Sequence, residues 1–364
     1  MSVYKNLVRP VLFQFYPENV HNKIILAGKV LGKINNPVFE YIGNKTRYKN
    51  KMLETKIFDT IFENTIGLAA GYDKNADIVG VAHYGGFGFE EVGSATAESR
   101  RGNKQLRLFR LPEDESIINR MGLNNDGIDR IASKLRKTKA RIPYFINITK
   151  THDACIIGER GIDDILYSFR KAYPLGTGIV ISVSCPNTAE GKTFENPEPL
   201  EKLLSRIDDE RQSYKWKPVL LKISPDIKDS DLEEDIGICR DYGINGFVVC
   251  NTTAGRDGLK TDRKIIEKIG KGGMSGKSLK EKSNMLVKKV YEMKDDDQII
   301  ICCGGIFSAE DAYEKVKLGS RLEEILTALP YEGNVVPKIN KGLARLLEKD
   351  GFRNLEEAVG YDVK

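Results

Sequence analysis

The sequence predicts an α/β fold, in which a (β/α)8 barrel follows a small N-terminal extension of two helices. Three observations support this prediction. Short apolar runs rich in β-branched residues recur from about residue 60 onward, longer stretches with helical spacing separate them, and the first 45 residues follow a different pattern. A length of 364 residues suits one large α/β barrel, or two domains. A doubly wound open sheet is the main alternative.

The first 45 residues predict two short amphipathic helices on either side of Tyr16-Pro17. Apolar residues recur at helical spacing from Val3 to Phe15 and again from Val20 to Leu31, and basic residues accompany them. Such helices suit either a cap on the barrel or a surface that enters the interface of an anionic bilayer.

A linker and a hairpin are predicted between these helices and the barrel. Pro37 and Gly43 indicate the linker, and the segment up to Asn64 has the pattern of an entry hairpin. The predicted domains are therefore a helical extension over residues 1–45 and a barrel over residues 46–364.

Eight apolar runs predict the barrel strands. They are residues 65–70, 88–92, 144–148, 178–183, 219–223, 246–249, 298–302 and 322–327. Helical spacing follows several of them, for example at 161–172, 199–211, 229–241 and 308–317. Eight strands with helical crossovers make a parallel TIM barrel, whose active site forms from the loops at the C-terminal ends of the strands. The eighth strand has the weakest pattern, because Glu323 and Glu324 fall inside it.

Composition narrows the possible functions. The net charge of +5 comes from 57 basic and 52 acidic residues, which is far from the basic stripe of a nucleic-acid binder, so we expect no nucleic-acid partner. The six cysteines show no CxxC spacing, which argues for reduced thiols and against disulfides or a structural zinc. The sequence starts without the apolar core of a signal peptide, and no run reaches the ~20 apolar residues of a spanning helix. We therefore expect neither secretion nor a membrane span.

Polar residues and glycines follow the predicted strands, and a barrel would bring them to one mouth. In strand order they are Ala70, Gly71 and Lys74; Ser94; Asn147; Cys185, Asn187 and Thr188; Lys222; Asn251 and Thr252; Gly304 and Gly305; and Thr327. The Gly-containing ends after the seventh and eighth strands suit a phosphate held by backbone N–H groups. The run 272–276 predicts a mobile or closely approached backbone loop.

Two lysines and four asparagines predict the type of ligand. Lys74 and Lys222 could hold an anion or stabilise charge on an electron-rich ring. Asn119, Asn147, Asn187 and Asn251 offer the paired donors and acceptors that suit the amide edges of a planar ring, although each alone could be a turn residue.

A cysteine ends the fourth apolar run. The thiol of Cys185 could remove a proton, attack an electrophile or have no chemical role. The chain has three histidines, and none follows a strand as a catalytic base would. We find no HExxH, no carboxylate cluster with metal spacing and no Walker motif, so we predict no metal site.

Seven segments in order resemble the dihydroorotate dehydrogenase family, the FMN-dependent barrels of pyrimidine synthesis. They are residues 67–74, 91–94, 109–114, 118–123, 184–188, 251–253 and 273–277. The resemblance covers nearly the whole chain. It implies that a base removes the C5 proton of dihydroorotate while hydride leaves C6 for flavin N5, which gives orotate.

The resemblance also implies a role for each matching residue. Cys185 takes the position of the general base, and Lys74 that of the group that holds the substrate carboxylate or stabilises its developing charge. FMN contacts are implied at Ala70, Gly71, Ser94, Asn147, Lys222, Cys250, Gly276, Gly304, Gly305, Leu326 and Thr327. Substrate contacts are implied at Lys74, Asn119, Arg120, Met121, Gly122, Leu123, Ser182, Asn187, Thr188, Asn251 and Thr252.

The N-terminal helices resemble the extension of the membrane-associated, quinone-using class. In that class the extension forms a tunnel for quinone, and His21 and Arg110 match positions that line it. The resemblance therefore favours a peripheral location on the cytoplasmic side of the cell membrane, with a cytoplasmic enzyme as the alternative.

Four residues depart from the family pattern. Cys185 stands where the quinone-using class has Ser and the soluble class has Cys. Ser182 replaces an Asn that contacts flavin and substrate, Cys250 replaces a Thr, and Leu326 replaces a Tyr. Losing a planar amide could relax specificity, because polar matching discriminates more strongly than shape.

Three hypotheses follow from these residues. The first is a quinone-dependent dihydroorotate dehydrogenase. The second is an FMN-dependent paralogue with a different cyclic substrate, or a soluble-type enzyme with another electron acceptor. The third is an FMN-binding or membrane-surface protein without turnover.

Overall fold

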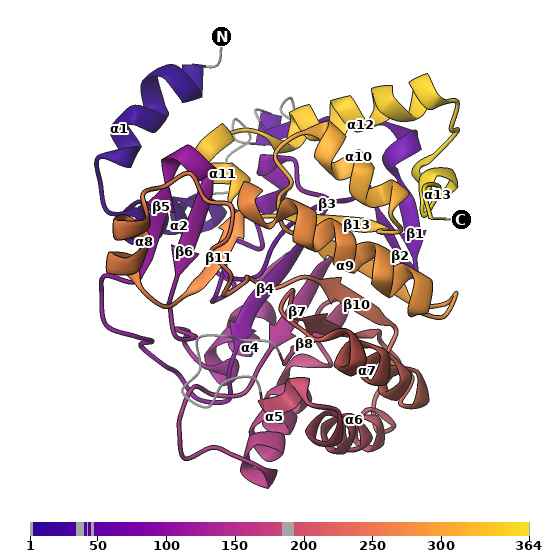
Figure 1. Cartoon of the computed structure of the whole chain (residues 1–364). Coiled ribbons are helices and arrows are strands. Elements are labelled where there is room, and N and C mark those ends of the chain that lie inside the picture. The colour runs from indigo at the N-terminus through magenta and orange to yellow at the C-terminus, as the bar shows by residue number, and fades with distance from the viewer. Residues whose placement is uncertain (1–2, 34–39, 42, 45–46, 184–192, 364) are drawn as a thin grey trace.

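The computed structural model describes residues 3–33, 40–41, 43–44, 47–183 and 193–363. A closed barrel of parallel strands confirms the predicted fold and excludes the open sheet (Figure 1). Its strands are β3 (Ile66–Leu68), β4 (Phe89–Ala95), β7 (Tyr144–Ile148), β8 (Gly178–Ser182), β9 (Val219–Ile223), β10 (Gly246–Val249), β12 (Ile299–Cys303) and β13 (Leu322–Ile325). Strands that follow one another in this series are neighbours, and β13 pairs with β3 to close the barrel.

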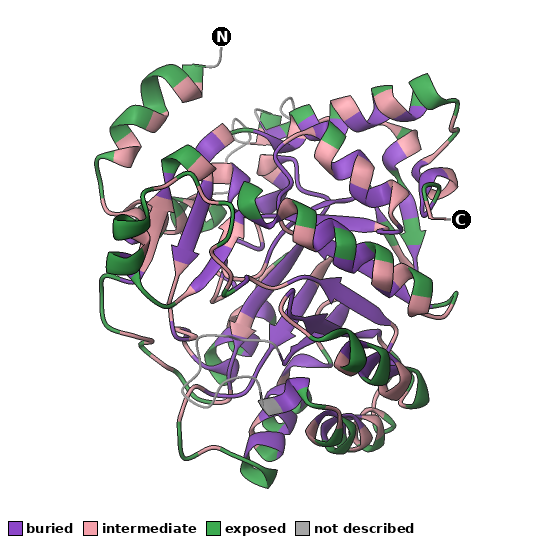
Figure 2. Cartoon of the chain, viewed as in Figure 1, coloured by how far each residue is buried: buried purple, intermediate pink, exposed green. Residues whose placement is uncertain are grey.

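Helices cover the outside of the barrel. They are α4 (Ile128–Leu135), α5 (Glu159–Ala172), α6 (Pro197–Arg211), α7 (Asp229–Asp241), α9 (Lys280–Met293), α10 (Ala309–Lys317) and α12 (Val336–Asp350). Figure 2 shows their buried faces toward the strands and their exposed faces toward solvent, as the helical spacing predicts. Shorter elements complete the chain: η2 (Lys51–Leu53), η3 (Ala82–Gly85), η4 (Pro112–Asp114), η5 (Thr193–Glu195), α8 (Arg263–Ile269), η6 (Lys277–Leu279), α11 (Ala328–Glu332) and α13 (Leu355–Ala358).

The interior of the barrel has an apolar layer and a polar layer. The apolar layer contains Phe89, Phe145, Val180, Leu220, Val248, Ile301 and Leu322. Side chains alternate along a strand, so the residues two positions further on face inward as well. These are Glu91, Asn147, Ser182, Lys222, Cys250, Cys303 and Glu324. The strands therefore place polar groups at their C-terminal ends, above an apolar base.

The predicted hairpin closes the base. Strands β1 (Thr55–Ile57) and β2 (Thr60–Phe62) pair in antiparallel fashion, and Ile57 and Phe62 join the apolar layer. The Phe62 ring lies 5.8 Å from that of Phe89 and 6.4 Å from that of Phe145. Burying these aromatic rings holds the entry segment against the barrel.

A second sheet stands beside the mouth of the barrel. Strands β5 (Leu108–Leu111), β6 (Ser116–Asn119) and β11 (Gly273–Gly276) form it in the antiparallel order β11-β6-β5. The prediction of a loop at 272–276 was therefore wrong. The expected close approach of backbone is confirmed, because a Cβ added to Gly276 would lie 2.5 Å from the Glu115 carbonyl oxygen.

The N-terminal extension consists of a π-helical turn η1 (Tyr4–Val8), α1 (Arg9–Phe13) and α2 (Pro17–Lys33). The Tyr4 hydroxyl donates to the Pro330 carbonyl at 2.9 Å, and the Phe13 and Tyr331 rings lie 5.4 Å apart. Figure 1 shows α2 beside the second sheet and α1 near α11. The domain boundary at residue 45 stays a prediction.

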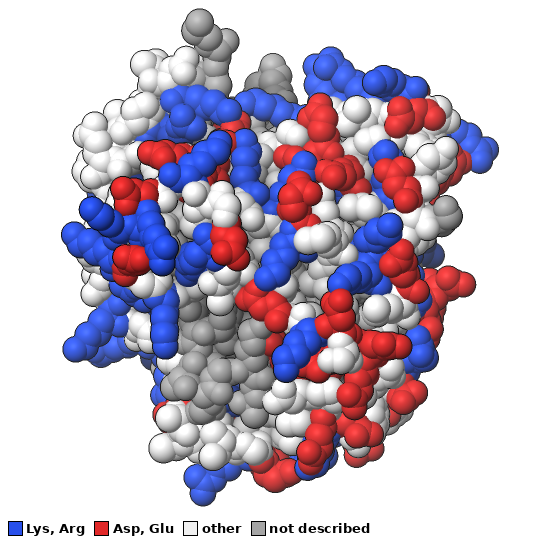
Figure 3. Space-filling view, in the orientation of Figure 1, with Lys and Arg blue, Asp and Glu red and all other residues white. Residues whose placement is uncertain are grey.

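The extension also presents exposed apolar side chains to solvent, among them Val3, Leu7, Val11 and Phe15. Among the described residues, no helix has both the length and the apolar character needed to cross a bilayer. On the face in Figure 3, basic and acidic side chains are interspersed. The expectation of no nucleic-acid partner stays a prediction.

Candidate active site

A cavity of about 300 Å³ lies at the C-terminal ends of the barrel strands, between the barrel, the second sheet and the N-terminal helices. The sequence-predicted site residues that line it are His21, Ala70, Gly71, Lys74, Ser94, Arg110, Asn119, Met121, Gly122, Leu123, Asn147, Ser182, Lys222, Cys250, Asn251, Thr252, Gly276, Gly304, Gly305, Leu326 and Thr327. The fold thus brings together residues from the ends of all eight barrel strands, from the second sheet and from the extension.

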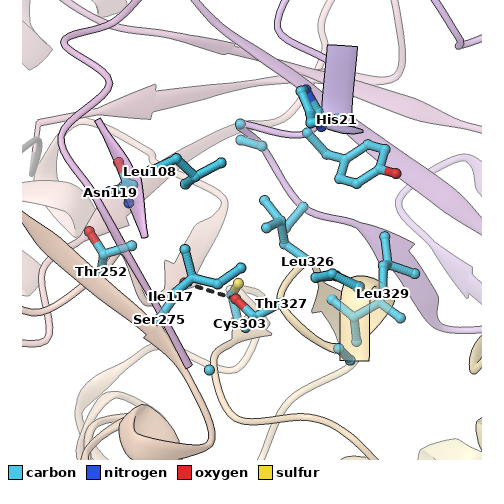
Figure 4. A pocket seen from close by; sticks show the side chains of 18 of the residues that line it. His21, Leu108, Ile117, Asn119, Thr252, Ser275, Cys303, Leu326, Thr327 and Leu329 are labelled. Atoms are coloured by element: carbon cyan, nitrogen blue, oxygen red, sulfur yellow. Dashed lines mark hydrogen bonds between the residues drawn. The ribbon is translucent and has the colours of Figure 1, made fainter. Parts of the chain in front are cut away.

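The cavity has a polar end and an apolar end. We call the part lined by Lys74, Ser94, Asn119, Asn147, Ser182, Lys222, Asn251, Thr252, Ser275 and Thr327 the polar end. The apolar end is lined by Leu12, Phe13, Pro17, Val20, Ile24, Leu326, Leu329 and Pro330, together with His21. Figure 4 shows Thr252, Ser275 and Thr327 on one side and His21, Leu326 and Leu329 on the other.

A buried cluster of charges supports the polar end. Lys222 Nζ lies 2.6 Å from Glu91 Oε2 and 3.6 Å from Glu324 Oε2. The Asn147 side-chain amide donates to Glu91 Oε1 at 2.6 Å. All four side chains are buried. Glu91 is therefore held by two donors, whereas the Glu324 oxygens accept no hydrogen bond from any described residue.

The pKa values of the cluster differ between its two carboxyl groups. Burial acts to raise the pKa of Glu91, but the charge of Lys222 together with hydrogen bonds from Lys222, Glu324 and Asn147 lowers it. Burial and the charge of Glu91 raise the pKa of Glu324 well above its usual range. Burial acts to lower the pKa of Lys222, but Glu91 and Glu324 hold it above its usual value. At neutral pH the cluster is thus an ion pair of Lys222 and Glu91 beside a protonated Glu324.

Lys74 supplies a second cation at the polar end. Its Nζ donates to the Gly71 carbonyl at 2.6 Å. Burial lowers the pKa of Lys74 to about 8, against the opposing charges of Glu18 and Asp73. No ion pair is formed by Lys74 among the described residues, so its charge is available to an anionic ligand.

Backbone and hydroxyl groups complete the polar end. Gly304 and Gly305 have φ values of 112° and 77°, and a Cβ added to Gly305 would lie 2.5 Å from Lys280 Cα. Glycine is therefore required for this backbone path. The Ser275 and Thr327 hydroxyls lie 2.8 Å apart and join β11 to the end of β13 (Figure 4).

The apolar end depends on the extension. The ring of His21 lies 4.9 Å from that of Tyr72, at 88°. Burial, together with the charge of Lys74, lowers the pKa of His21 to about 3, so its imidazole is neutral at physiological pH. The Arg110 guanidinium lies 4.4 Å from the Phe13 ring centroid and donates to the Phe15 carbonyl at 2.9 Å. Arg110 thus fastens the extension to β5.

Four predicted residues are not among the described residues that line the cavity. Cys185, Asn187 and Thr188 lie outside the described residues. The Arg120 guanidinium does not line the cavity but donates to the carbonyls of Ile269 and Leu106. The substrate contact at Arg120 stays a prediction, and since its guanidinium binds backbone carbonyls, the contact would have to use its backbone.

Sequence reasoning missed the partners of Lys222. Glu91 was part of a recognised segment without a role of its own, and Glu324 counted only as a weak point of the eighth strand. The alternation of side chains along β4, β9 and β13 was the available signal, since it turns all three groups inward.

Comparison with known proteins agrees with this geometry. The sequence profile of the family "Dihydroorotate dehydrogenase" matches residues 52–347. The proteins named dihydroorotate dehydrogenase (quinone) from Gloeobacter violaceus and Natronomonas pharaonis are each 37% identical to this chain. The alignments cover 99% of both chains for the first and 100% of both for the second.

A solved structure is also similar to this chain over almost its full length. The crystal structure of DHODH from Eimeria tenella in complex with ferulenol superposes with a TM-score of 0.86 at 27% sequence identity, over 98% of each chain. Family profile, full-length relatives and fold agree, and the chain belongs to the dihydroorotate dehydrogenase family.

Proposed function

We propose that this protein oxidises dihydroorotate to orotate in pyrimidine biosynthesis and passes the electrons to a quinone. The observation that carries the proposal is a single cavity with a charged, hydrogen-bonding end and an apolar end. A small anionic pyrimidine fits the first, and an apolar acceptor fits the second. Full-length similarity to proteins named dihydroorotate dehydrogenase (quinone) supports both assignments.

The residues between the two ends fit FMN. Asn147 Oδ1 is buried without a hydrogen-bond partner among the described residues, so it is available to an N–H group of a ligand. A Cβ added to Gly71 would meet only Leu326, at 3.8 Å, so glycine leaves open space there. Lys222 would approach the ring, and the backbone at Gly276, Gly304 and Gly305 with Thr327 would hold the phosphate. When bound, FMN supplies the hydride acceptor that no side chain provides.

Lys74 and the asparagines would hold the substrate. The Lys74 ammonium would pair with the carboxylate of dihydroorotate, and Asn119, Asn251 and Thr252 would bind the amide edges of its ring. Asn187 and Thr188 are proposed for the same task from the sequence alone. Together these groups would orient C5 of the substrate toward the base and exclude water from it.

Cys185 would be the general base that takes the C5 proton. A free thiol has a pKa of ~8.5, far below that of a serine hydroxyl, so it needs less activation at neutral pH. We therefore expect activity to persist to lower pH than in a variant with Ser at this position.

The extension would deliver the quinone from a membrane. Its outer side exposes Val3, Leu7, Val11 and Phe15, while its inner side lines the apolar end with Phe13 and Val20. Apolar side chains with basic residues beside them suit the interface of an anionic bilayer. We propose peripheral attachment on the cytoplasmic side of the cell membrane.

A second candidate rests on Ser182, which lines the cavity in place of the family's Asn. A paralogue that acts on another cyclic substrate would explain this change, because a lost amide removes one discriminating contact. A soluble-type enzyme that uses another electron acceptor would instead explain Cys185, because the soluble class has Cys at this position.

Steady-state assays with different acceptors test the proposal. We expect dihydroorotate oxidation to be supported by ubiquinone or menaquinone and not by fumarate or NAD. Turnover with fumarate or NAD alone would assign the protein to another class. Activity with a different cyclic substrate and none with dihydroorotate would favour the paralogue.

A further inference from the structure

A buried ion pair joins the N-terminal extension to β5. Glu18, in the first turn of α2, is 3% exposed and Arg107, which directly precedes β5, is 7% exposed. Arg107 Nε lies 3.1 Å from both Glu18 carboxylate oxygens, and Nη2 lies 2.6 Å from Oε1. This bidentate geometry fixes the orientation of the guanidinium plane.

The other side of the same guanidinium holds two loops together. Arg107 Nη1 donates to the carbonyls of Arg101 at 2.7 Å, Asn103 at 2.8 Å and Met121 at 3.4 Å. The Asn103 backbone N–H also donates to the Met121 carbonyl at 3.0 Å, and its side chain donates to the Arg120 carbonyl at 3.0 Å. Residues 101–103 are thereby fastened to residues 120–121.

The contact between these loops leaves little room for adjustment. A Cβ added to Gly102 would lie 2.2 Å from the Met121 carbonyl oxygen, and one added to Gly122 would lie 2.7 Å from the Asn103 backbone nitrogen. Both glycines have positive φ, of 74° and 71°. A shift of residues 101–103 would therefore move the segment 119–123, which we call the substrate segment and whose Asn119, Met121, Gly122 and Leu123 line the cavity.

Tyr16 of the extension also binds the chain at Arg107. The Tyr16 hydroxyl accepts hydrogen bonds from the backbone N–H groups of Arg107 at 2.6 Å and Leu108 at 3.2 Å. Tyr16 and Glu18 therefore both bind the start of β5, from which Arg107 reaches the substrate segment.

We propose that Glu18 is a positioning residue for the substrate segment, through which the extension sets the affinity for the carboxylated pyrimidine as well as covering the apolar end. The inference rests on the proposed substrate role of residues 119–123. Glu18 does not line the cavity, so it would position the substrate segment through Arg107. Its charge also raises the pKa of Lys74, so orotate binding is compared at about pH 6, where the Lys74 amine stays protonated with or without Glu18. Without its carboxylate, Arg107 would have to remain buried without its counter-charge or turn away and release three carbonyls.

The test compares Glu18→Gln with a matched control, Glu332→Gln, in the FMN-loaded protein. Glu332 forms another described ion pair between the extension and the barrel, with Lys5 at 2.5 Å, but Lys5 is 39% exposed. We expect Glu18→Gln to raise the Kd for orotate and the KM for dihydroorotate by about tenfold, since small displacements of binding groups have effects of this order or larger. Glu332→Gln should change both by less than about twofold. The kcat at saturating dihydroorotate should stay within about twofold in both variants.

Two further variants keep the inference testable if Glu18→Gln folds poorly. Glu18→Asp keeps the charge and should give an intermediate Kd. The double variant Glu18→Gln with Arg107→Gln should have an orotate Kd no higher than that of the single variant that binds orotate less tightly. The reason is that each substitution removes the same Glu18–Arg107 interaction. Wild-type affinity in Glu18→Gln, or additive losses in the double variant, would overturn the inference.

Failure of the inference and failure of the proposed function give different results. If wild-type protein does not bind orotate, the proposed function fails. Amide hydrogen exchange would then still report on Glu18, which should protect residues 119–123 more in wild type than in Glu18→Gln. Equal protection would contradict the positioning role.

Discussion

The polar and apolar ends of the cavity are built from different parts of the chain. The barrel and the second sheet supply the polar end. Inward-facing barrel residues lie one layer above the apolar base, and Asn119 and Ser275 come from β6 and β11. The apolar end is lined by strand-end loops and by the helices α1 and α2, which are not part of the barrel. The groups that would contact a charged ligand therefore come from the barrel and the second sheet, whereas the apolar site is formed in part by the extension itself.

The two ends also differ in charge. At the polar end, Lys222 is compensated by Glu91, and Lys74 remains as the cation for an anionic ligand. At the apolar end, His21 is neutral because burial and Lys74 lower its pKa to about 3. This separation is what a reaction between a charged pyrimidine and an uncharged acceptor requires, and each prediction below tests one end against the other.

The largest effect is expected from Cys185→Ala. Removing a general base should slow flavin reduction by dihydroorotate by about 10²–10⁴-fold, because proton transfer contributes that much. Reoxidation by quinone and the FMN content should stay near wild type, since both depend on other residues. Stopped-flow absorbance measures each step. Normal flavin reduction in this variant would remove Cys185 from its assigned role.

Cys185→Ser serves as the companion variant. A hydroxyl has a much higher pKa than a thiol, so the pH profile of flavin reduction should move to higher pH. An unchanged profile would count against the thiol as the base.

The next largest effect is the loss of stability that we expect from substituting Glu91 but not from substituting Glu324. Glu91→Gln removes the ionised partner of a buried ammonium group and should cost about 3–5 kcal/mol of unfolding free energy. Glu324→Gln replaces a protonated carboxyl group by a neutral amide of similar shape and should cost less than about 1 kcal/mol. Urea unfolding at neutral pH gives both values. Equal losses would show that the two carboxyl groups share one charge state.

A smaller effect is expected from pH at the polar end. The pKa of Lys74 is about 8, so its amine loses its proton as the pH rises through 8. Orotate affinity should be constant below this value and should fall above it by up to about tenfold per pH unit, with proton uptake on binding. Calorimetry in buffers of different ionisation enthalpy measures both quantities.

Lys74→Arg is the control for this prediction. Arginine stays charged over the whole range, so the decline above pH 8 should disappear. A decline that persists in Lys74→Arg would place the titrating group elsewhere.

The smallest effect is expected at the apolar end. Leu329→Val removes one methylene and should weaken quinone binding by about 0.8 kcal/mol, or roughly fourfold in KM. The orotate Kd should not follow, because Leu329 belongs to the other end. Leu106→Val is a matched control, since Leu106 is 58% exposed and does not line the cavity. Equal shifts in orotate and quinone binding would mean that the two ends are not separate.

Much of the fold could be predicted because the barrel strands are buried on both sides. Such strands appear as continuous apolar runs, and all eight were found near their observed bounds. Strands β5 and β6 were not predicted, and β11 was taken for a loop. Its sequence, Gly-Met-Ser-Gly, is poor in strand-forming residues, and only pairing with β6 makes it a strand.

The site could be predicted where it depends on strand ends and not where it depends on contacts between distant residues. Lys222 was found from its position, but its partner Glu91 is 131 residues away in sequence. Arg107 and Glu18 are 89 residues apart, and nothing local connects them. The partner of a buried charge of this kind can be identified only from the three-dimensional structure.

Anaerobic mixing of the FMN-loaded protein with dihydroorotate, followed by quinone, tests the central claim most directly. We predict that dihydroorotate bleaches the visible flavin absorbance and that quinone restores it, because one cavity contains both the polar end proposed for dihydroorotate and the apolar end proposed for quinone. Flavin that stays bound but is not bleached by dihydroorotate would contradict the account of the polar end. Bleaching that quinone does not reverse would contradict the account of the apolar end.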